Sequence, residues 1–479
     1  MQPPTSTYSK IRFIGYAIPT NPGNSKPAPP PATAGTYMGD LDNTTDITAR
    51  VQVMKNAVDT AKASLPPDPP GEVINVFVAP EFFFGGRRGA YIWDPIFKTE
   101  GDPLITLQTQ LAAAFPVADY PDWTFVCGTM PSARVVEWEK VADEPLTNVR
   151  NNVVRGLTEQ WDAAFGPMQQ AIQVMLVGFI QNCRANPSLT VHCRSVVHSN
   201  IGLGLFDDEQ IVQTLNTQKT FASYEDFVLY DPSRTAEFMG PAVITEPMVA
   251  YPNIDLSNGD LKRAADDNYA IFRQFISPTG WFNMGVEVCL DHNNYRLRRN
   301  IVNNPFHPPK NADPTLRLAS AIHVHIIPAM GGFIIPPAIA AGADGFVFNC
   351  DGQFAIGDPN NAGTPTVATT DTANVNLNCL FVDYNYVDSQ QTTYQAHTQF
   401  ARVATPAHTG DPHDGNATTV ELTANDAADV SVVPVKPPAA VTLDHYFAGG
   451  PGAIHIYGAT TPLEISSVPQ LTPLAPPQG

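Results

Sequence analysis

The chain has 479 residues, of which 43% are hydrophobic and only 15% are charged, and its formal net charge is −19. This length and apolar content allow a large buried core, either as two average domains or as one large domain with insertions. Neutralising phosphates requires clustered Lys and Arg, so the acidic balance argues against nucleic acid and against an anionic membrane surface as partners. The composition alone selects no function.

The prolines, glycines and cysteines restrict the class of protein further. The 46 prolines and 33 glycines predict long loops rather than a helical bundle. The six cysteines form no CxxC pair, which is typical of free thiols in a reducing compartment. Residues 1–10 lack the apolar stretch of a signal peptide, and the apolar segment 331–341 is too short to span a bilayer. These features predict a cytoplasmic protein.

The first part of the chain alternates strand and helix patterns. Residues 11–18 and 73–80 are apolar runs typical of buried strands. Between them, apolar residues recur at helical spacing from Ile47 to Leu65, with Thr45 or Asp46 as the expected cap. This order predicts a strand–helix–strand unit that places Glu81 just after its second strand.

The chain continues in the same alternation to about residue 355. The expected strands cover residues 123–129, 284–289, 322–328 and 345–350, and the expected helices cover residues 157–186 and 261–276. A hairpin of residues 195–206 and 211–215 leads into Lys219. Buried strands mixed with helices and one hairpin predict an α/β protein with a mixed sheet.

The C-terminal part differs in composition. Beyond about residue 355 the chain is rich in Thr, Asn and Asp, and only residues 420–435 and 453–457 have strand patterns. Proline density rises again towards the end, which predicts an extended tail. Residues 356–479 are therefore expected to form a strand-rich extension that packs on the core or on an oligomer interface.

Three residues with catalytic potential stand in comparable settings. Glu81 and Cys289 each follow an apolar run, and Lys219 follows the hairpin. Cysteine attacks as the thiolate and needs a base or a positive neighbour. If the three residues meet, Glu81 takes the thiol proton and Lys219 stabilises the negative charge that develops during attack. The alternative is that Cys289 is a small core residue, as cysteines at strand ends commonly are.

The segments around these residues resemble the three motifs of the nitrilase (carbon–nitrogen hydrolase) superfamily. The segments are Ala79-Pro80-Glu81-Phe82-Phe83, Gln218-Lys219-Thr220-Phe221 and Gly285-Val286-Glu287-Val288-Cys289-Leu290-Asp291. The order Glu, Lys, Cys matches, and Asn200 is similar to an asparagine that the family often shows upstream of its lysine. The resemblance implies an αββα sandwich, a Glu-Lys-Cys triad and hydrolysis of a carbon–nitrogen bond through a thioester. It also implies a homo-oligomer, a dimer or larger.

The resemblance covers residues 10–355 discontinuously, so residues 1–355 are expected to form the catalytic domain. The spacings between the three motifs are wider than the family usually has. Insertions are therefore expected at about residues 19–39, 157–190 and 230–270. The arginine-containing run that follows the cysteine in the family is matched only loosely, by Tyr295-Arg296-Leu297-Arg298-Arg299.

Two further features belong to the expected site. Many family members carry a second acidic residue after the lysine, and Glu225 is the candidate here, with Asp226 as the second choice. It would orient Lys219 or position the hydrolytic water; the alternative is an ordinary helix-cap or surface acid. The backbone N–H groups of Asp291 and His292 are expected to help shape an oxyanion site.

A histidine pair offers a different chemistry. His323 and His325 form His-x-His on an expected strand, where the period of two puts both side chains on one face, as a metal site requires. The alternative is two histidines that are hydrogen-bonded in the core. No cluster of Asp or Glu accompanies the pair in the sequence.

The resemblance implies a cofactor-independent amidase or nitrilase that acts on a small-molecule amide or nitrile. It would release ammonia or an amine and a carboxylic acid. An amide is slightly favoured, because Asp291 follows Leu290 where many nitrilases have Trp-Glu. Three alternatives stay open: a metal-dependent hydrolase that uses His323 and His325, a nitrilase-like acyltransferase, and a non-catalytic binding protein.

Overall fold

The computed structural model describes a discontinuous set of residues. These are residues 2–20, 38–87, 89–93, 102–135, 169–171, 174, 189–205, 210–222, 249–250, 270–298, 322–353, 367–368, 379–389, 391–405, 421–423 and 429–465. The expected insertions lie mostly outside this set, as does the expected helix 157–186 except for residues 169–171 and 174.

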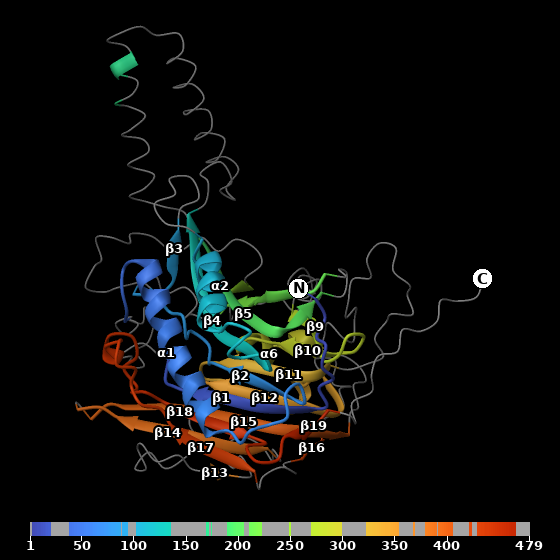
Figure 1. The fold of residues 1–479 in the computed structure, drawn as a ribbon. Coiled ribbons are helices and arrows are strands. Elements are labelled where there is room, and N and C mark those ends of the chain that lie inside the picture. Colours follow the sequence, from blue (N-terminus) through green and yellow to red (C-terminus); the bar gives the residue numbers. More distant parts are fainter. Residues whose placement is uncertain are drawn as a thin grey trace.

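Strands dominate the described part of the chain (Figure 1). One mixed sheet contains 17 strands, and a separate pair consists of β7 (Phe221–Ala222) and β8 (Val249–Ala250). The strands of the large sheet are β1 (Lys10–Ala17), β2 (Val73–Val78), β3 (Tyr91–Trp93), β4 (Trp123–Val135), β5 (Leu189–Gly204), β6 (Val212–Gln218), β9 (Ile271–Phe275), β10 (Trp281–Val286), β11 (Ile322–Ala329), β12 (Ala341–Asp351), β13 (Val367–Ala368), β14 (Leu380–Val387), β15 (Thr393–Thr405), β16 (Glu421–Thr423), β17 (Val430–Pro434), β18 (Ala453–Tyr457) and β19 (Leu463–Glu464).

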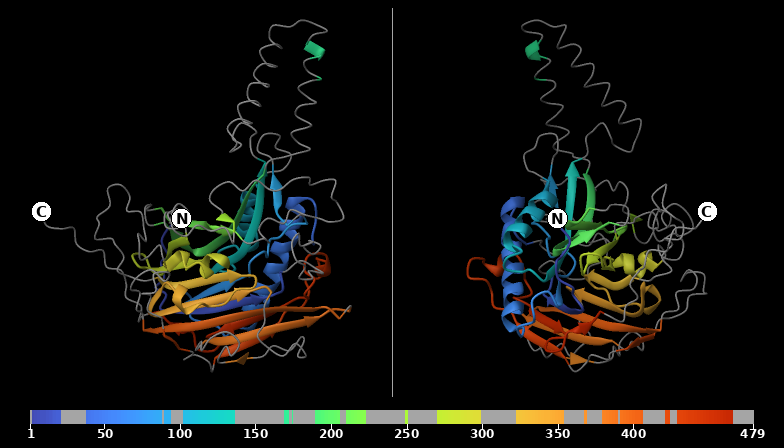
Figure 2. Two further views of the ribbon diagram at one scale, coloured as in Figure 1. Left: turned by 180° about the vertical axis from the view of Figure 1, so that it is seen from behind. Right: turned by 45° about the vertical axis from the view of Figure 1, so that its right-hand side comes forward.

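The expected αββα sandwich is wrong. The two longest described helices, α1 (Asn43–Ser64) and α2 (Pro103–Ala114), lie together on one side of the sheet in all views (Figures 1 and 2). Apart from the fragment 169–171, the other described helical segments are α6 (Leu290–Asn293) and the 3₁₀ turns η6 (Pro336–Ala338) and η8 (Leu443–His445). The described architecture is therefore a curled, mostly β structure with one helical face.

Two groups of parallel strands bear the candidate residues. Strand β1 pairs in parallel with β2, and β2 with β4. Strands β10, β11 and β12 form the second parallel group. Glu81 follows the carboxyl end of β2, and Cys289 follows that of β10. Carboxyl ends of parallel strands are where α/β proteins commonly place their sites.

The two parallel groups pack face to face. Phe13 of β1 contacts three aromatic rings of β12 and β15, with centroid distances of 5.5 Å to Phe346, 5.4 Å to Phe348 and 5.6 Å to Phe400. The approach is close, because a Cβ on Gly15 would lie 2.4 Å from Thr398 Cγ2. The sheet therefore curls over a shared apolar cluster to which both groups contribute.

Helix α1 buries one side against the outer face of the first parallel group. Ile47, Met54 and Val58 belong to the core cluster beneath it. The helix begins earlier than expected, because the Asp42 side chain is the cap and accepts the Thr45 N–H at 2.7 Å. Asp46 is instead buried and pairs with Arg50. None of the described helices is both long and apolar enough to cross a bilayer.

One predicted helix is wrong, and three of the described elements were not expected. Residues 271–275 form strand β9, not the end of a helix 261–276, because they pair antiparallel with β10; residues 261–269 lie outside the described set. Helix α2 and the long strands β14 and β15 were not expected. Strand β15 pairs with β12, and β18 pairs with β1, so strands beyond residue 356 belong to the same sheet as those before it.

Candidate active site

The loop after β2 holds Glu81 through its backbone. The Glu81 N–H donates to Ala329 O at 3.2 Å, and the Thr20 hydroxyl donates to Glu81 O at 2.6 Å. The next residue, Phe82, has a positive φ of 58° and donates its N–H to Thr129 Oγ1 at 2.7 Å. Because three separate segments contact this turn, the position of the Glu81 side chain is fixed.

A bulge in β4 makes room for the same turn. The register between β4 and β5 shifts between Val126 and Thr129. Gly128 lies in the bulge with φ +66°, and a Cβ there would stand 2.0 Å from Pro80 O. Only glycine fits at this close approach, so the bulge and the Glu81 turn depend on each other.

Lys219 approaches Glu81 from the end of β6. The strand ends at Gln218, and the Lys219 N–H then donates to Cys193 O at 2.9 Å. Lys219 Nζ lies 2.8 Å from Glu81 Oε1, and both side chains are fully buried. The ammonium also lies 5.8 Å from the centroid of the Phe82 ring. The structure therefore joins two of the predicted site residues in a buried ion pair.

Cys289 completes the group from a strained turn. It has φ 44° and ψ −104°, a backbone conformation that non-glycine residues rarely adopt and that costs about 1–3 kcal/mol. Its N–H donates to Pro328 O at 3.1 Å, and its Sγ lies 3.8 Å from Met330 O. The thiol is within hydrogen-bond reach of Glu81. Glu81, Lys219 and Cys289 thus converge, as the sequence predicts.

The electrostatic environment keeps the resting thiol protonated. Burial and the neighbouring Glu81 carboxylate raise the pKa of Cys289 well above its ordinary value, and the Lys219 ammonium lowers it less strongly. Ionisation of a thiol beside a carboxylate is disfavoured, because both anions would share one site. Transfer of the Cys289 proton to Glu81 during attack would avoid this second negative charge.

The segment after β11 forms another wall of the site. The Met330 N–H donates to Glu81 Oε2 at 3.1 Å. The next two amides, of Gly331 and Gly332, both donate to Asp351 Oδ2 at 2.7 Å. A Cβ on Gly332 would lie 3.9 Å from Cys289 Sγ, so this glycine borders the nucleophile. No pattern of residue types marks Asp351 in the sequence, because it contacts this segment through backbone amides.

The amides expected at the oxyanion site have other acceptors. The Asp291 N–H donates to Val288 O and the His292 N–H donates to Cys289 O, both at 2.9 Å. Leu290 begins α6, and no described backbone group accepts its N–H. The two predicted amides are therefore already bonded within the turn, whereas the Leu290 amide has no backbone acceptor among the described residues.

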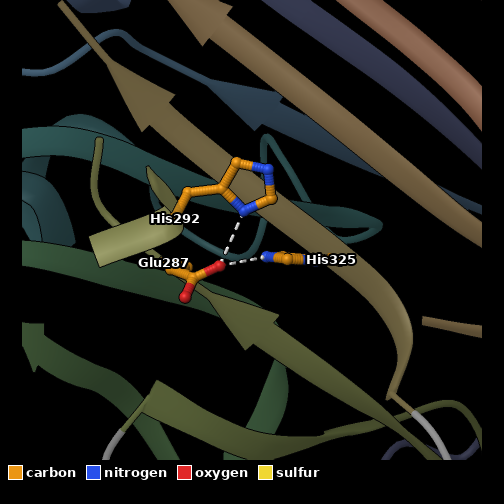
Figure 3. A group of neighbouring side chains, drawn as sticks. All are labelled: Glu287, His292 and His325. Carbon is orange, nitrogen blue, oxygen red and sulfur yellow. Dashed lines mark hydrogen bonds and ion pairs between the residues drawn. The ribbon is translucent and has the colours of Figure 1, made fainter. Parts of the chain in front are cut away.

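A second buried group surrounds Glu287, two residues before the nucleophile (Figure 3). Glu287 Oε2 lies 2.8 Å from His292 Nδ1 and 3.0 Å from His325 Nε2, and Oε1 accepts the Leu297 N–H at 2.7 Å. Burial would raise the pKa of Glu287, but the hydrogen bonds and electrostatic interactions with the two histidines outweigh it and lower the pKa to about 2. The carboxylate is therefore ionised and saturated with donors.

The three ligand atoms of this group lie within 4.8 Å of one another, a spacing that a metal ion could use. The opposite ring nitrogens argue against it. His292 Nε2 accepts the Ile335 N–H at 2.9 Å, and His325 Nδ1 accepts the Ala340 N–H at 3.4 Å. Both rings therefore carry their proton on the nitrogen that faces Glu287, where a metal ion would need a lone pair. The group fits a hydrogen-bond network better than a metal centre.

The predicted His-x-His pair does not act as a unit. His323 Nδ1 accepts the Asn283 N–H at 3.0 Å, whereas His325 belongs to the Glu287 network. Asn200 is also structural, since its Nδ2 donates to Phe115 O at 3.0 Å and to Tyr120 O at 2.8 Å. Glu225 and Asp226 lie outside the described residues.

Comparison with protein-family models, with curated proteins and with solved structures gave no match.

Proposed function

We propose that the chain is a hydrolase of non-peptide carbon–nitrogen bonds, with Cys289 as nucleophile. The observation that carries the proposal is the convergence of Cys289 on the buried Glu81–Lys219 ion pair, with 2.8 Å between Nζ and Oε1. A base, a cation and a thiol within reach of one another supply the functions that acyl transfer through cysteine needs. The resemblance of the three motifs to nitrilase-superfamily motifs supports the same chemistry.

The proposed first half-reaction forms a thioester. The Cys289 proton moves to Glu81 as Sγ attacks the amide carbonyl carbon. The Lys219 ammonium and the Leu290 amide stabilise the negative oxygen of the tetrahedral intermediate, a contribution of about 10²–10³ in rate for one such donor. Glu81 then returns the proton to the nitrogen, the carbon–nitrogen bond breaks, and ammonia or an amine leaves.

The second half-reaction releases the acid. Glu81, again a carboxylate, takes a proton from a water molecule as its oxygen attacks the thioester carbon. The carbon–sulfur bond breaks, the proton returns to sulfur and the carboxylic acid departs. With a nitrile, Sγ would attack the nitrile carbon while the thiol proton passes through Glu81 to the nitrogen, which gives a thioimidate. Addition of one water molecule and loss of ammonia then give the same thioester. An amide remains the first substrate class to test, and a homo-oligomer remains a prediction for sedimentation measurements.

The test is ammonia release from a panel of small amides and nitriles. The wild-type protein is expected to release ammonia from at least one of them, and Cys289→Ala is expected to release none above background. Cys379→Ala is the matched control, because Cys379 is a buried cysteine in the core cluster against which Cys289 packs. Equal turnover by wild type and Cys289→Ala would overturn the proposal.

Two of the alternatives have direct tests in the same assay. Hydroxylamine competes with water for a thioester, so formation of a hydroxamate faster than hydrolysis would identify an acyltransferase. A lack of Cys289 labelling by iodoacetamide at neutral pH, together with no ammonia release from any member of the panel, would favour a non-catalytic binding protein. His292 and His325 carry their protons on the ring nitrogens that face Glu287, so no specific observation favours the metal-dependent hydrolase.

A further inference from the structure

A buried ion pair links the turn of the nucleophile to the segment that bears the lysine. Asp291 Oδ2 lies 2.7 Å from Arg296 Nη1, and both side chains are fully buried. The Asp291 carboxylate also accepts the Thr220 N–H, at 3.0 Å through Oδ1 and 2.9 Å through Oδ2. Arg296 Nη1 donates to Gln218 O at 2.9 Å. The pair thus contacts the backbone on both sides of Lys219.

These contacts fix the segment where regular pairing ends. Strand β6 stops at Gln218 and β7 begins at Phe221, so Lys219 and Thr220 lie between the two strands and outside either ladder. The Lys219 N–H donates to Cys193 O, and the Asp291–Arg296 pair holds the carbonyl before Lys219 and the amide after it. Three consecutive backbone positions therefore have fixed partners, and this directs the lysine side chain towards Glu81.

The Asp291–Arg296 pair also connects the segment of Lys219 to the turn that bears Cys289. Asp291 stands two residues after Cys289 in the same turn, Lys219 contacts Glu81, and Glu81 reaches the Cys289 thiol. A shift of Asp291 would therefore move Lys219 relative to the nucleophile. Misplacement of a catalytic group by 1 Å can reduce a rate by about 10²-fold.

We propose that Asp291 and Arg296 are positioning residues that set Lys219 against Glu81 and Cys289; this inference rests on the function proposed above. A buried ion pair is weak support for stability, since well-packed apolar residues of similar volume are often as stable. The pair instead fixes the backbone around Lys219. Both carboxylate oxygens of Asp291 accept one peptide N–H, and the Arg296 guanidinium donates to one peptide carbonyl.

The double variant Asp291→Leu/Arg296→Met tests the proposal, because it removes both charges together and leaves the net charge unchanged. It is expected to fold, with a circular dichroism spectrum like that of wild type. Its kcat is expected to fall at least about ten-fold with KM changed less than about three-fold. The pH midpoint of Cys289 alkylation by iodoacetamide is expected to rise by about one unit, because the Lys219 ammonium lowers the pKa of Cys289.

The matched control is Arg12→Met/Asp68→Leu. That pair also joins a fully buried arginine to an aspartate at 2.7 Å. Arg12 lies near the start of β1 and also contacts Asn75 of β2, upstream of the carboxyl end where Glu81 stands. The control is expected to leave the alkylation midpoint unchanged. An unchanged midpoint and kcat in a folded Asp291→Leu/Arg296→Met would overturn the inference.

Asp291→Asn carries the test if the double variant does not fold. Loss of the carboxylate charge alone would lower the pKa of Cys289, whereas displacement of Lys219 would raise it. A raised alkylation midpoint therefore supports the positioning role, and a lowered or unchanged one contradicts it. Alkylation needs no substrate, so failure to find amide hydrolysis would count against the proposed function and leave this readout intact.

Discussion

Lys219 Nζ lies 2.8 Å from Glu81 Oε1 in an environment where neither side chain is exposed. Each charge depends on the other, because an isolated ion in the interior is strongly destabilising. Glu81 also accepts the Met330 N–H through its second oxygen, at 3.1 Å. The pair therefore connects β6, the turn after β2 and the segment after β11, and its integrity is a condition for both folding and chemistry.

Removing one member of this pair should destabilise the protein more than removing both. Glu81→Gln and Lys219→Met are each expected to lower the free energy of unfolding by about 3–5 kcal/mol, because each leaves an unpaired buried charge. The double variant is expected to lose less than either single variant, because it leaves no unpaired buried charge. Urea unfolding of all four proteins measures the coupling, and strictly additive losses would show that the ion pair is not formed.

Glu81→Gln and Lys219→Met should shift the pKa of Cys289 in opposite directions. Glu81 raises the pKa of Cys289 and Lys219 lowers it. Glu81→Gln is therefore expected to lower the pH midpoint of iodoacetamide labelling, and Lys219→Met is expected to raise it. Glu81→Gln should nevertheless lose ammonia release, because the proton acceptor is gone. A midpoint that moves in the same direction in both variants would contradict the geometry.

The local patterns of the sequence predict the site better than they predict the fold. Glu81, Lys219 and Cys289 each follow the end of a strand, and a strand end is visible in an apolar run. Which strands pair is not visible, since pairing depends on residues far apart in the chain. The curled sheet, with β18 against β1 and β15 against β12, therefore could not be read from the order of elements.

Buried polar residues explain the other failures. Strand β14 buries Asp383 and Asn385, and these two polar residues interrupt its apolar and aromatic run, so it lacks the continuous apolar pattern of the other buried strands. Asp291 acts on Lys219 through a backbone amide, and backbone contacts leave no pattern of residue types. Glu287 is visible in the nucleophile motif, but its two histidine partners, one of them 38 positions away, come together only in the fold.

Gly128 should be irreplaceable for the Glu81 turn. Gly128→Ala would place a methyl group 2.0 Å from Pro80 O at φ +66°, so the turn must move. We expect a loss of about 2–4 kcal/mol in unfolding free energy, from strain and overpacking together, and a large fall in ammonia release. Gly458→Ala is the control for strain alone, because it has φ +75° but no contact shorter than 3.3 Å; it should lose about 1 kcal/mol and keep its activity. Equal losses in the two variants would argue against the collision at Pro80.

Acid should destabilise the protein through two buried histidines before it protonates the carboxylates. Burial lowers the pKa of His198 to about 4, and burial with the neighbouring His397 lowers that of His455 to about 3. In the unfolded chain both titrate near the ordinary value of 6.5. Between these limits the unfolded state binds more protons, so stability falls as the pH falls, by up to about 1.4 kcal/mol per pH unit for each histidine.

The measurement is urea unfolding at half-unit steps from pH 7 to pH 4. His455→Gln removes one titrating group, and its amide can still bond the Thr398 hydroxyl that His455 Nδ1 contacts at 2.9 Å. The variant is expected to have a lower stability at pH 7 but a flatter dependence on pH below 6.5. His445→Gln is the control, because His445 is exposed and should leave the slope unchanged. An unaltered slope in His455→Gln would mean that His455 is protonated in the folded protein, contrary to its burial among Thr398, Tyr457 and the apolar core.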